Sequence, residues 1–229
     1  MGLDLNSSIS QDRKSTKISA TLKDMSANEF KEFNNEVLGY LQQNNHENMI
    51  SEPSSFRVIF TYMVEAIVNS LLYGLFIGIL LITLIIGLFF RSYLLPALSI
   101  FPNILPIGMG FGLWGLFVGD VGFMVAVGMG STLGVIVDFT VHFLSKYELA
   151  RKEFKKSVEE SVIYSFETVG FALIIMTVVL ALGFSVLNLV TFIPIQDFAK
   201  FSVICFIGGL IINFLFLPNL LMKFDKRKF

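Results

Sequence analysis

The residue with the clearest capacity for chemistry in this sequence is Asp138, a carboxylic acid inside a long apolar run. His142 follows it by four residues, and Gly134 and Gly130 precede it at the same interval. On a helix this spacing places all four on one face, where small residues let a neighbouring helix approach closely. The pattern therefore predicts a helix face that combines close packing with two groups able to bind protons.

An ionised carboxylate in a membrane-spanning helix costs about 2.5–3.5 kcal/mol on insertion scales, so Asp138 is expected to face protein or water. Burial disfavours the charged form of a carboxylate, and histidine titrates near neutral pH. Asp138 and His142 are therefore candidates for a proton relay that changes state as the packing changes. A structural interpretation stays open, in which Asp138 hydrogen-bonds to a Ser or Thr of another helix and His142 caps that bond. Asn103, Asn188 and Asn213 are further candidates for hydrogen bonds between helices.

The composition indicates which solvent surrounds these groups. Of the 229 residues, 54% are hydrophobic and only 15% are charged, and the mean hydropathy is +0.72. A soluble chain carries about 25% charged residues, so most of this chain must lie in a lipid bilayer. The net charge of −1 provides no basic surface for nucleic acid.

The usual catalytic and cofactor sites are not indicated. The single cysteine, Cys205, excludes an intrachain disulfide and a CxxC metal site. The two histidines, His46 and His142, lie on opposite sides of the first three expected spans, which argues against a metal site, and no phosphate-binding loop of the GxxxxGK[ST] type is present. We expect no metal, no cofactor and no enzymatic activity.

A spanning helix needs about 20 mostly apolar residues, and five runs meet that requirement. The expected spans are 65–90, 94–118, 121–144, 164–190 and 198–222, within a transmembrane domain of residues 58–229. The expected fold is an all-α polytopic membrane protein with five transmembrane helices.

Basic residues predict the orientation, because cytoplasmic loops carry an excess of Lys and Arg. Arg91 lies between the first two spans, residues 146–156 between the third and fourth hold five basic residues, and residues 223–228 after the fifth hold four. The opposite connections hold almost none. The C-terminus is therefore expected in the cytoplasm and residues 1–57 outside it, in a multi-pass protein of the cell (inner or plasma) membrane.

The polar segment before the first span predicts one strand and one helix. Residues 17–22 alternate polar and apolar side chains as a half-buried strand does. Residues 26–29 match a capping box, and apolar residues continue at helical spacing from Phe30 to Leu41. Because one strand cannot complete a sheet, residues 1–57 are interpreted as the C-terminal part of a larger extracytoplasmic α+β domain.

Three passages carry a family resemblance. They are residues 89–92 (FFRS) with 101–106 (FPNILP), residues 134–143 (GVIVDFTVHF) and residues 217–221 (LPNLL). They resemble the "FRS … PNxLP" passage, the GxxxD motif of the tenth span and the "LPxLL" ending of the twelfth span in the resistance-nodulation-division (RND) superfamily. The likeness is closest to its MMPL-type exporters, which are related to sterol-sensing-domain proteins, and it covers about residues 58–222.

The resemblance implies a proton-motive-force-driven exporter of lipid or hydrophobic compounds, built from two six-span repeats. It implies that this chain is the C-terminal half, spans 8 to 12, and it assigns Asp138 to the proton relay. We therefore predict a proton relay of Asp138 and His142, with Gly130, Gly134 and Phe139 shaping the site and packing the helices. Phe139 stands where the family often has Tyr. The implied partners are the lipid bilayer, the missing N-terminal half on the same or a separate chain, and the substrate; homo-oligomer formation stays open.

Two alternatives remain at this point. A sterol-sensing-like or scaffold module would bind lipid or partner helices through the same face without pumping. A nonfunctional remnant of a longer reading frame would retain the motifs without either role.

Overall fold

The computed structural model describes residues 9–10, 12, 14–23, 25, 27–45, 53–119 and 121–227. It divides the chain into two compact units, Met1–Thr61 and Tyr62–Phe229. The helices in chain order are α1 (Ala27–Asn44), α2 (Phe56–Phe90), α3 (Leu94–Phe117), α4 (Phe123–Lys152), α5 (Val158–Ser165), the π-helical turn η3 (Phe166–Gly170), α6 (Phe171–Val186), the 3-10 turn η4 (Leu187–Leu189) and α7 (Ile193–Phe224).

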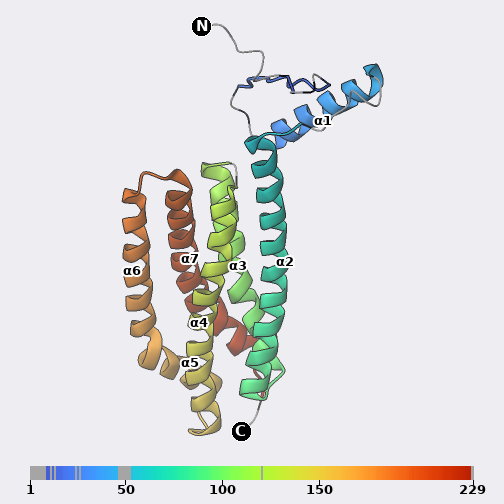
Figure 1. Ribbon diagram of the computed structural model, residues 1–229. Helices are drawn as coiled ribbons and strands as arrows, with labels where there is room; N and C mark the ends of the chain where they lie inside the picture. Colours follow the sequence, from blue (N-terminus) through green and yellow to red (C-terminus); the bar gives the residue numbers. More distant parts are fainter. Residues whose placement is uncertain are drawn as a thin grey trace. The chain divides into compact units, whose positions relative to one another are not determined.

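Five stretches of helix are long and apolar enough to cross a membrane: α2, α3, α4, the continuous run from α5 through η4, and α7 (Figure 1). The prediction of an all-α polytopic fold with five spans is confirmed. These stretches hold 24 to 35 residues, so at about 1.5 Å per residue each is longer than the roughly 30 Å hydrocarbon core. Helix α4 in particular continues beyond Leu144, its expected end, to Lys152.

The predicted α+β fragment is not seen, and the strand expected at residues 17–22 is wrong. Those residues have no regular structure, and the β-structure in the described part of the first unit is one isolated bridge between Ile9 and Thr16. An alternating sequence forms a strand only where a neighbouring strand accepts its backbone hydrogen bonds. The helix expected next is confirmed as α1, while Ser26 of the expected capping box and His46 lie outside the described residues.

Helix α7 is the centre of the membrane unit. It packs against α3, α4 and α6, and 56% of its most apolar stretch is buried, compared with 6% of that stretch in α2. Phe201 of α7 is fully buried and contacts the rings of Phe111 and Trp114 of α3, with ring centroids 4.9 and 6.2 Å away. Helix α4 makes its most extensive contacts with α7.

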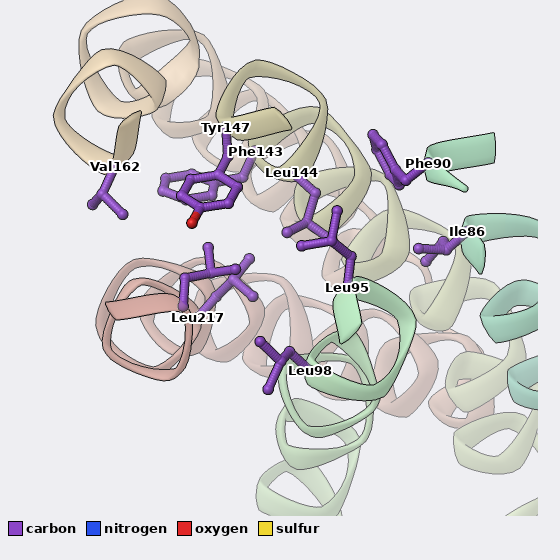
Figure 2. Close-up of a cluster of buried hydrophobic side chains, with 10 residues drawn as sticks. Ile86, Phe90, Leu95, Leu98, Phe143, Leu144, Tyr147, Val162 and Leu217 are labelled. Carbon is purple, nitrogen blue, oxygen red and sulfur yellow. The ribbon is translucent and has the colours of Figure 1, made fainter. Parts of the chain in front are cut away.

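We call the end of this unit that carries the α2–α3 turn, the α4–α5 turn and residue 227 the basic end. A cluster of buried apolar side chains fills the bundle there (Figure 2), and five helices contribute to it. Its members are Ile86, Phe90, Leu95, Leu98, Phe143, Leu144, Tyr147, Val162, Leu217 and Leu221. The phenol ring of Tyr147 lies in this cluster. Its hydroxyl points out of the cluster toward Asp225.

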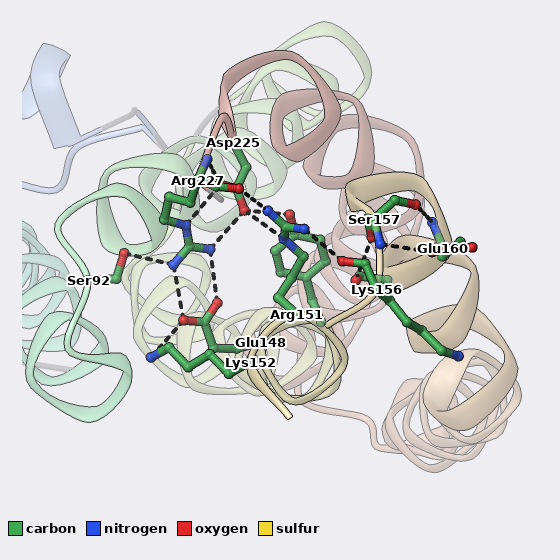
Figure 3. Close-up of polar contacts among 11 residues, drawn as sticks. Ser92, Glu148, Arg151, Lys152, Lys156, Ser157, Glu160, Asp225 and Arg227 are labelled. Carbon is green, nitrogen blue, oxygen red and sulfur yellow. Dashed lines mark hydrogen bonds and ion pairs between the residues drawn. The ribbon is translucent and has the colours of Figure 1, made fainter. Parts of the chain in front are cut away.

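A buried ion-pair network closes the basic end (Figure 3). The Arg227 guanidinium donates two hydrogen bonds to the Glu148 carboxylate, at 3.0 and 2.9 Å, and two to the Asp225 carboxylate, at 2.9 and 2.8 Å. Tyr147 donates its hydroxyl to Asp225 at 2.6 Å. Because Glu148 belongs to α4 and Asp225 directly follows α7, the network fixes the ends of these two helices together.

Backbone carbonyls extend the network to the two turns at the basic end. Lys152 donates to the carbonyl of Phe90 at 2.9 Å, next to the α2–α3 turn. Arg151 donates to the carbonyl of Lys156 at 2.7 Å, in the α4–α5 turn. The part of α4 beyond the hydrocarbon therefore supplies Glu148, Arg151 and Lys152. These residues bond to the α2–α3 turn, to the α4–α5 turn and to Arg227 in the tail after α7.

The pKa values of Asp225 and Arg227 in this network are displaced from their ordinary values. Burial alone would raise the pKa of Asp225, but hydrogen bonds from Arg227 and Tyr147 outweigh it and hold the pKa at about 2, below the ordinary 3.8. Burial would likewise lower the pKa of Arg227, and its bonds to Asp225 and Glu148 raise it instead. Both groups are therefore charged throughout the neutral range.

We expect Asp225→Asn to lower the unfolding free energy of the chain by about 3 kcal/mol at neutral pH, because removing one member of a buried ion-pair network leaves the others uncompensated. Since the folded-state pKa is depressed, the contribution of Asp225 is complete above about pH 4 and is lost as the pH falls toward about 2. Thermal unfolding in detergent should show the difference between wild type and variant shrinking across that window.

The matched control is Asp197→Asn at the other end of α7. Its carboxylate lies 3.9 Å from Lys200, and both side chains are partly exposed, so this change should cost well under about 1 kcal/mol. Equal losses for the two variants, or a difference for Asp225→Asn that stays constant between pH 4 and 2, would contradict the assignment.

Candidate functional site

The structure brings Asp138 and His142 together midway along α4. The Asp138 Oδ1 atom lies 3.3 Å from the His142 Nε2 atom, as expected for residues four apart on a helix. The two side chains are 47% and 56% exposed, respectively, so their face of α4 is covered by no other described part of the chain. Such a pair in a membrane protein must face water or protein.

Gly130 and Gly134, on the same face of α4, are also free of contacts with other helices of the described chain. A Cβ atom built on Gly130 or Gly134 meets no other heavy atom within 4 Å. We call the surface of α4 formed by Gly130, Gly134, Asp138 and His142 the open face. No helix of the described chain packs closely on it, so the packing role of these glycines stays a prediction for a partner outside this chain.

Phe139 points away from the open face. It is fully buried and clusters with Val169 of η3 and Leu173 of α6. A Cβ atom on Gly209 of α7 would lie 3.5 Å from its ring. Phe139 therefore belongs to the packed inner side of α4, in apolar surroundings, and its predicted role in shaping the site stays a prediction.

A buried polar cluster on the inner side of α4 was only partly foreseen. The hydroxyl of Thr140 lies 2.7 Å from Asn103 Oδ1 of α3 and 2.9 Å from Asn213 Oδ1 of α7, and all three residues are at most 3% exposed. We call these three residues the triad. The expected interhelical bonds of Asn103 and Asn213 are confirmed, whereas Asn188 donates to the carbonyl of Ser185 beside it.

Thr140 itself was missed by the sequence analysis. A threonine in a helix usually bonds to a carbonyl of its own preceding turn, so a single Thr in an apolar run indicates no partner. The available signal was the coincidence of a polar residue in each of three expected spans, but the sequence does not show that Asn103, Thr140 and Asn213 lie at one depth.

The chain matches a known protein family over nearly its whole length. The model described as the MMPL family covers residues 5–222. No curated protein matches the chain.

Two glycine substitutions test whether the open face is free in this chain. At Gly110 of α3, a Cβ atom would lie 2.6 Å from the Cys205 Sγ atom of α7, so Gly110→Ala should overpack the bundle and cost about 1–3 kcal/mol of unfolding free energy. At Gly134 an added methyl group meets nothing, and Gly134→Ala should leave stability unchanged. Thermal unfolding of the purified chain in detergent measures both, and equal destabilisation would show that Gly134 is already packed.

Proposed function

Because this chain belongs to the MMPL family, whose members are transporters, we propose that it is the C-terminal half of a proton-motive-force-driven RND-type exporter. The proposed substrate class is lipid or hydrophobic compounds. Asp138 and His142 form the proton relay, and Gly130, Gly134 and Phe139 shape it. The chain is a transporter component and not an enzyme.

The observation that supports this proposal is the half-exposed Asp138–His142 pair on the open face, in the middle of a spanning helix. Lipid cannot solvate an ion pair, so a protein surface or a water path must cover it. The N-terminal half of the permease, on the same chain or a separate one, is the proposed occupant. Flat, glycine-lined helix faces permit the close approach that such docking needs.

The pair provides a charge that changes with protonation. A proton that binds Asp138 neutralises its carboxylate and removes its attraction to His142, 3.3 Å away. The open face then presents a different charge to the docked half. In the proposed transport cycle, the protonated and the unprotonated Asp138 each favour a different packing of the two permease halves. In one packing the substrate path opens to one side of the membrane, and in the other packing it opens to the opposite side.

We place the basic end in the cytoplasm and residues 1–57 on the other side of the cell membrane. Ten of the eleven basic residues of the membrane unit lie at residue 91, within residues 146–156 or within residues 223–228, at the basic end, and Lys200 is the exception. Loops rich in Lys and Arg remain on the cytoplasmic side. Protons would then move from the exterior toward the basic end, down the proton-motive force.

The decisive variant is Asp138→Asn, which keeps the side-chain shape and removes its titration. In membrane vesicles that contain the complete permease and hold an imposed pH gradient, we expect wild type to export the fluorescent lipophilic probe N-phenyl-1-naphthylamine. Asp138→Asn should reduce that efflux to the level of vesicles without permease, because the carboxyl group can no longer exchange a proton. Probe fluorescence gives the efflux rate, and a pH-sensitive dye in the vesicle lumen gives the accompanying proton flux.

Asp197→Asn is the matched control and should retain both signals, since its carboxylate faces only Lys200 at the far end of α7. Normal efflux by Asp138→Asn would rule out the proton relay. If, in addition, a bulky residue at Gly134 prevented the halves from assembling, the alternative of a lipid-binding or scaffold module would hold. Efflux that survives a protonophore would refute the proton-motive drive.

A further inference from the structure

The Thr140 hydroxyl of the triad has one proton to donate but three acceptor oxygens around it. The Thr140 hydroxyl lies within hydrogen-bond distance of the Asn103 and Asn213 amides and 3.3 Å from the Ile136 carbonyl of its own helix. A hydroxyl donates one proton and accepts others. The two contacts with the amides are satisfied together only if one amide presents its NH₂ group to the Thr140 oxygen.

The bond between Asn213 and its own helix decides which amide this is. Asn213 donates its Nδ2 to the Gly209 carbonyl at 3.1 Å, so its Oδ1 atom must face Thr140 and accept the hydroxyl proton. An amide can turn end for end without changing shape, and its hydrogen bonds determine the orientation. The structure draws the Asn103 Oδ1 atom toward the same hydroxyl, so this contact is a hydrogen bond beside the first only with the Asn103 amide turned end for end, its NH₂ donating to Thr140. That orientation gives one directed chain of bonds from α3 through α4 to α7.

The triad is related to Asp138 by simple helical geometry. Thr140 follows Asp138 by two residues, which is about 3 Å along the axis and about 200° around it. The two side chains consequently stand at the same depth on opposite sides of α4. The open face is 47% exposed at Asp138 and has no packing of its own in the described chain, so the inner side must set the rotation of the helix.

Apolar packing between helices in a bilayer acts through van der Waals contact and shape, without a hydrophobic driving force. Hydrogen bonds are directional, and each bond of the triad joins α4 to a different helix. Interhelical hydrogen bonds in membranes contribute only modestly to stability. At this site the hydrogen bonds therefore matter for the orientation of α4 more than for its stability.

We propose that the Asn103–Thr140–Asn213 triad is a positioning element, which holds α4 in the rotation that presents Asp138 and His142 to the open face. The transport part of this inference rests on the proposed function, in which Asp138 carries the proton. The rotation of α4 does not depend on that function and is measured separately.

The rotation test uses the 229-residue chain in liposomes with two spin labels. After Cys205→Ala removes the only native thiol, cysteines at Gly134 on the open face and at Ile211, an exposed residue of α7, carry the labels. Pulsed electron paramagnetic resonance should give one narrow distance distribution for the parent chain. Thr140→Val, which has nearly the same shape and no hydroxyl, should broaden or shift it, and Thr140→Ser should restore it.

The transport test uses the same substitutions in the complete permease with native Cys205. We expect Thr140→Val to slow efflux of N-phenyl-1-naphthylamine by about tenfold to a hundredfold, the scale expected when a functional group is displaced by about 1 Å. Thr140→Ser should restore it. The matched control is Thr177→Val: Thr177 is also buried, in α6, and its hydroxyl donates to the Leu173 carbonyl of its own helix. This control should change neither the distance distribution nor the efflux.

Each outcome decides the proposal. An unchanged distance distribution and normal efflux in Thr140→Val overturn it. If Thr140→Val fails to fold because two buried amides lose their partner, the all-apolar variant Asn103→Leu, Thr140→Val, Asn213→Leu decides, since it leaves no amide unpaired. A folded triple variant with a broadened distribution supports the proposal, whereas an unchanged distribution or a failure to fold shows a purely structural role. If Thr140→Val changes the distance distribution but the wild-type permease does not export the probe, the positioning role holds and the proposed function is wrong.

Discussion

In the hydrocarbon core no water is present to pair with a polar side chain, so every such group must find its partner in protein. Three polar groups of α4 are paired in three different ways, Thr140 and Asp138 within the hydrocarbon and Glu148 beyond it. Thr140 is paired with two other helices, Glu148 is paired with the tail after α7, and Asp138 is paired with His142 on the same helix. The first two arrangements are buried and complete, and the third is half exposed.

The difference follows from how closely α7 approaches α4 on one side. At Gly128 of α4 a Cβ atom would lie 3.1 Å from the Phe201 ring, and at Gly209 of α7 it would lie 3.0 Å from Ile136. These small residues bring the backbones near enough for the short side chains of Thr140 and Asn213 to meet. On the open face the glycines have the same capacity, but no described helix uses it. The described chain thus has one packed side of α4 and one open side.

Local signals in the sequence predicted some of these features and could not predict others. Five spans follow from apolar length alone, and the common face of Asp138 and His142 follows from four-residue spacing. The strand at residues 17–22 failed because alternation is necessary for a strand but does not supply a partner. Arg227 was interpreted only as a signal of orientation, since its bonds join residues 79 positions apart. The triad could not be predicted for the same reason, because its members contact one another but lie 37 and 73 positions apart in the sequence.

The separation of the two polar sites on α4 bears on how a proton could act. The triad is neutral, so its hydrogen bonds do not change when a proton reaches Asp138 on the opposite side of the helix. The ion-pair network at the basic end keeps its charge until well below neutral pH, because the pKa of Asp225 is about 2. A proton bound at Asp138 would therefore alter the open face while both attachments of α4 to α7 persist. In the proposed exporter, the moving boundary would then lie between the open face and the docked half, and α4 would move together with α7.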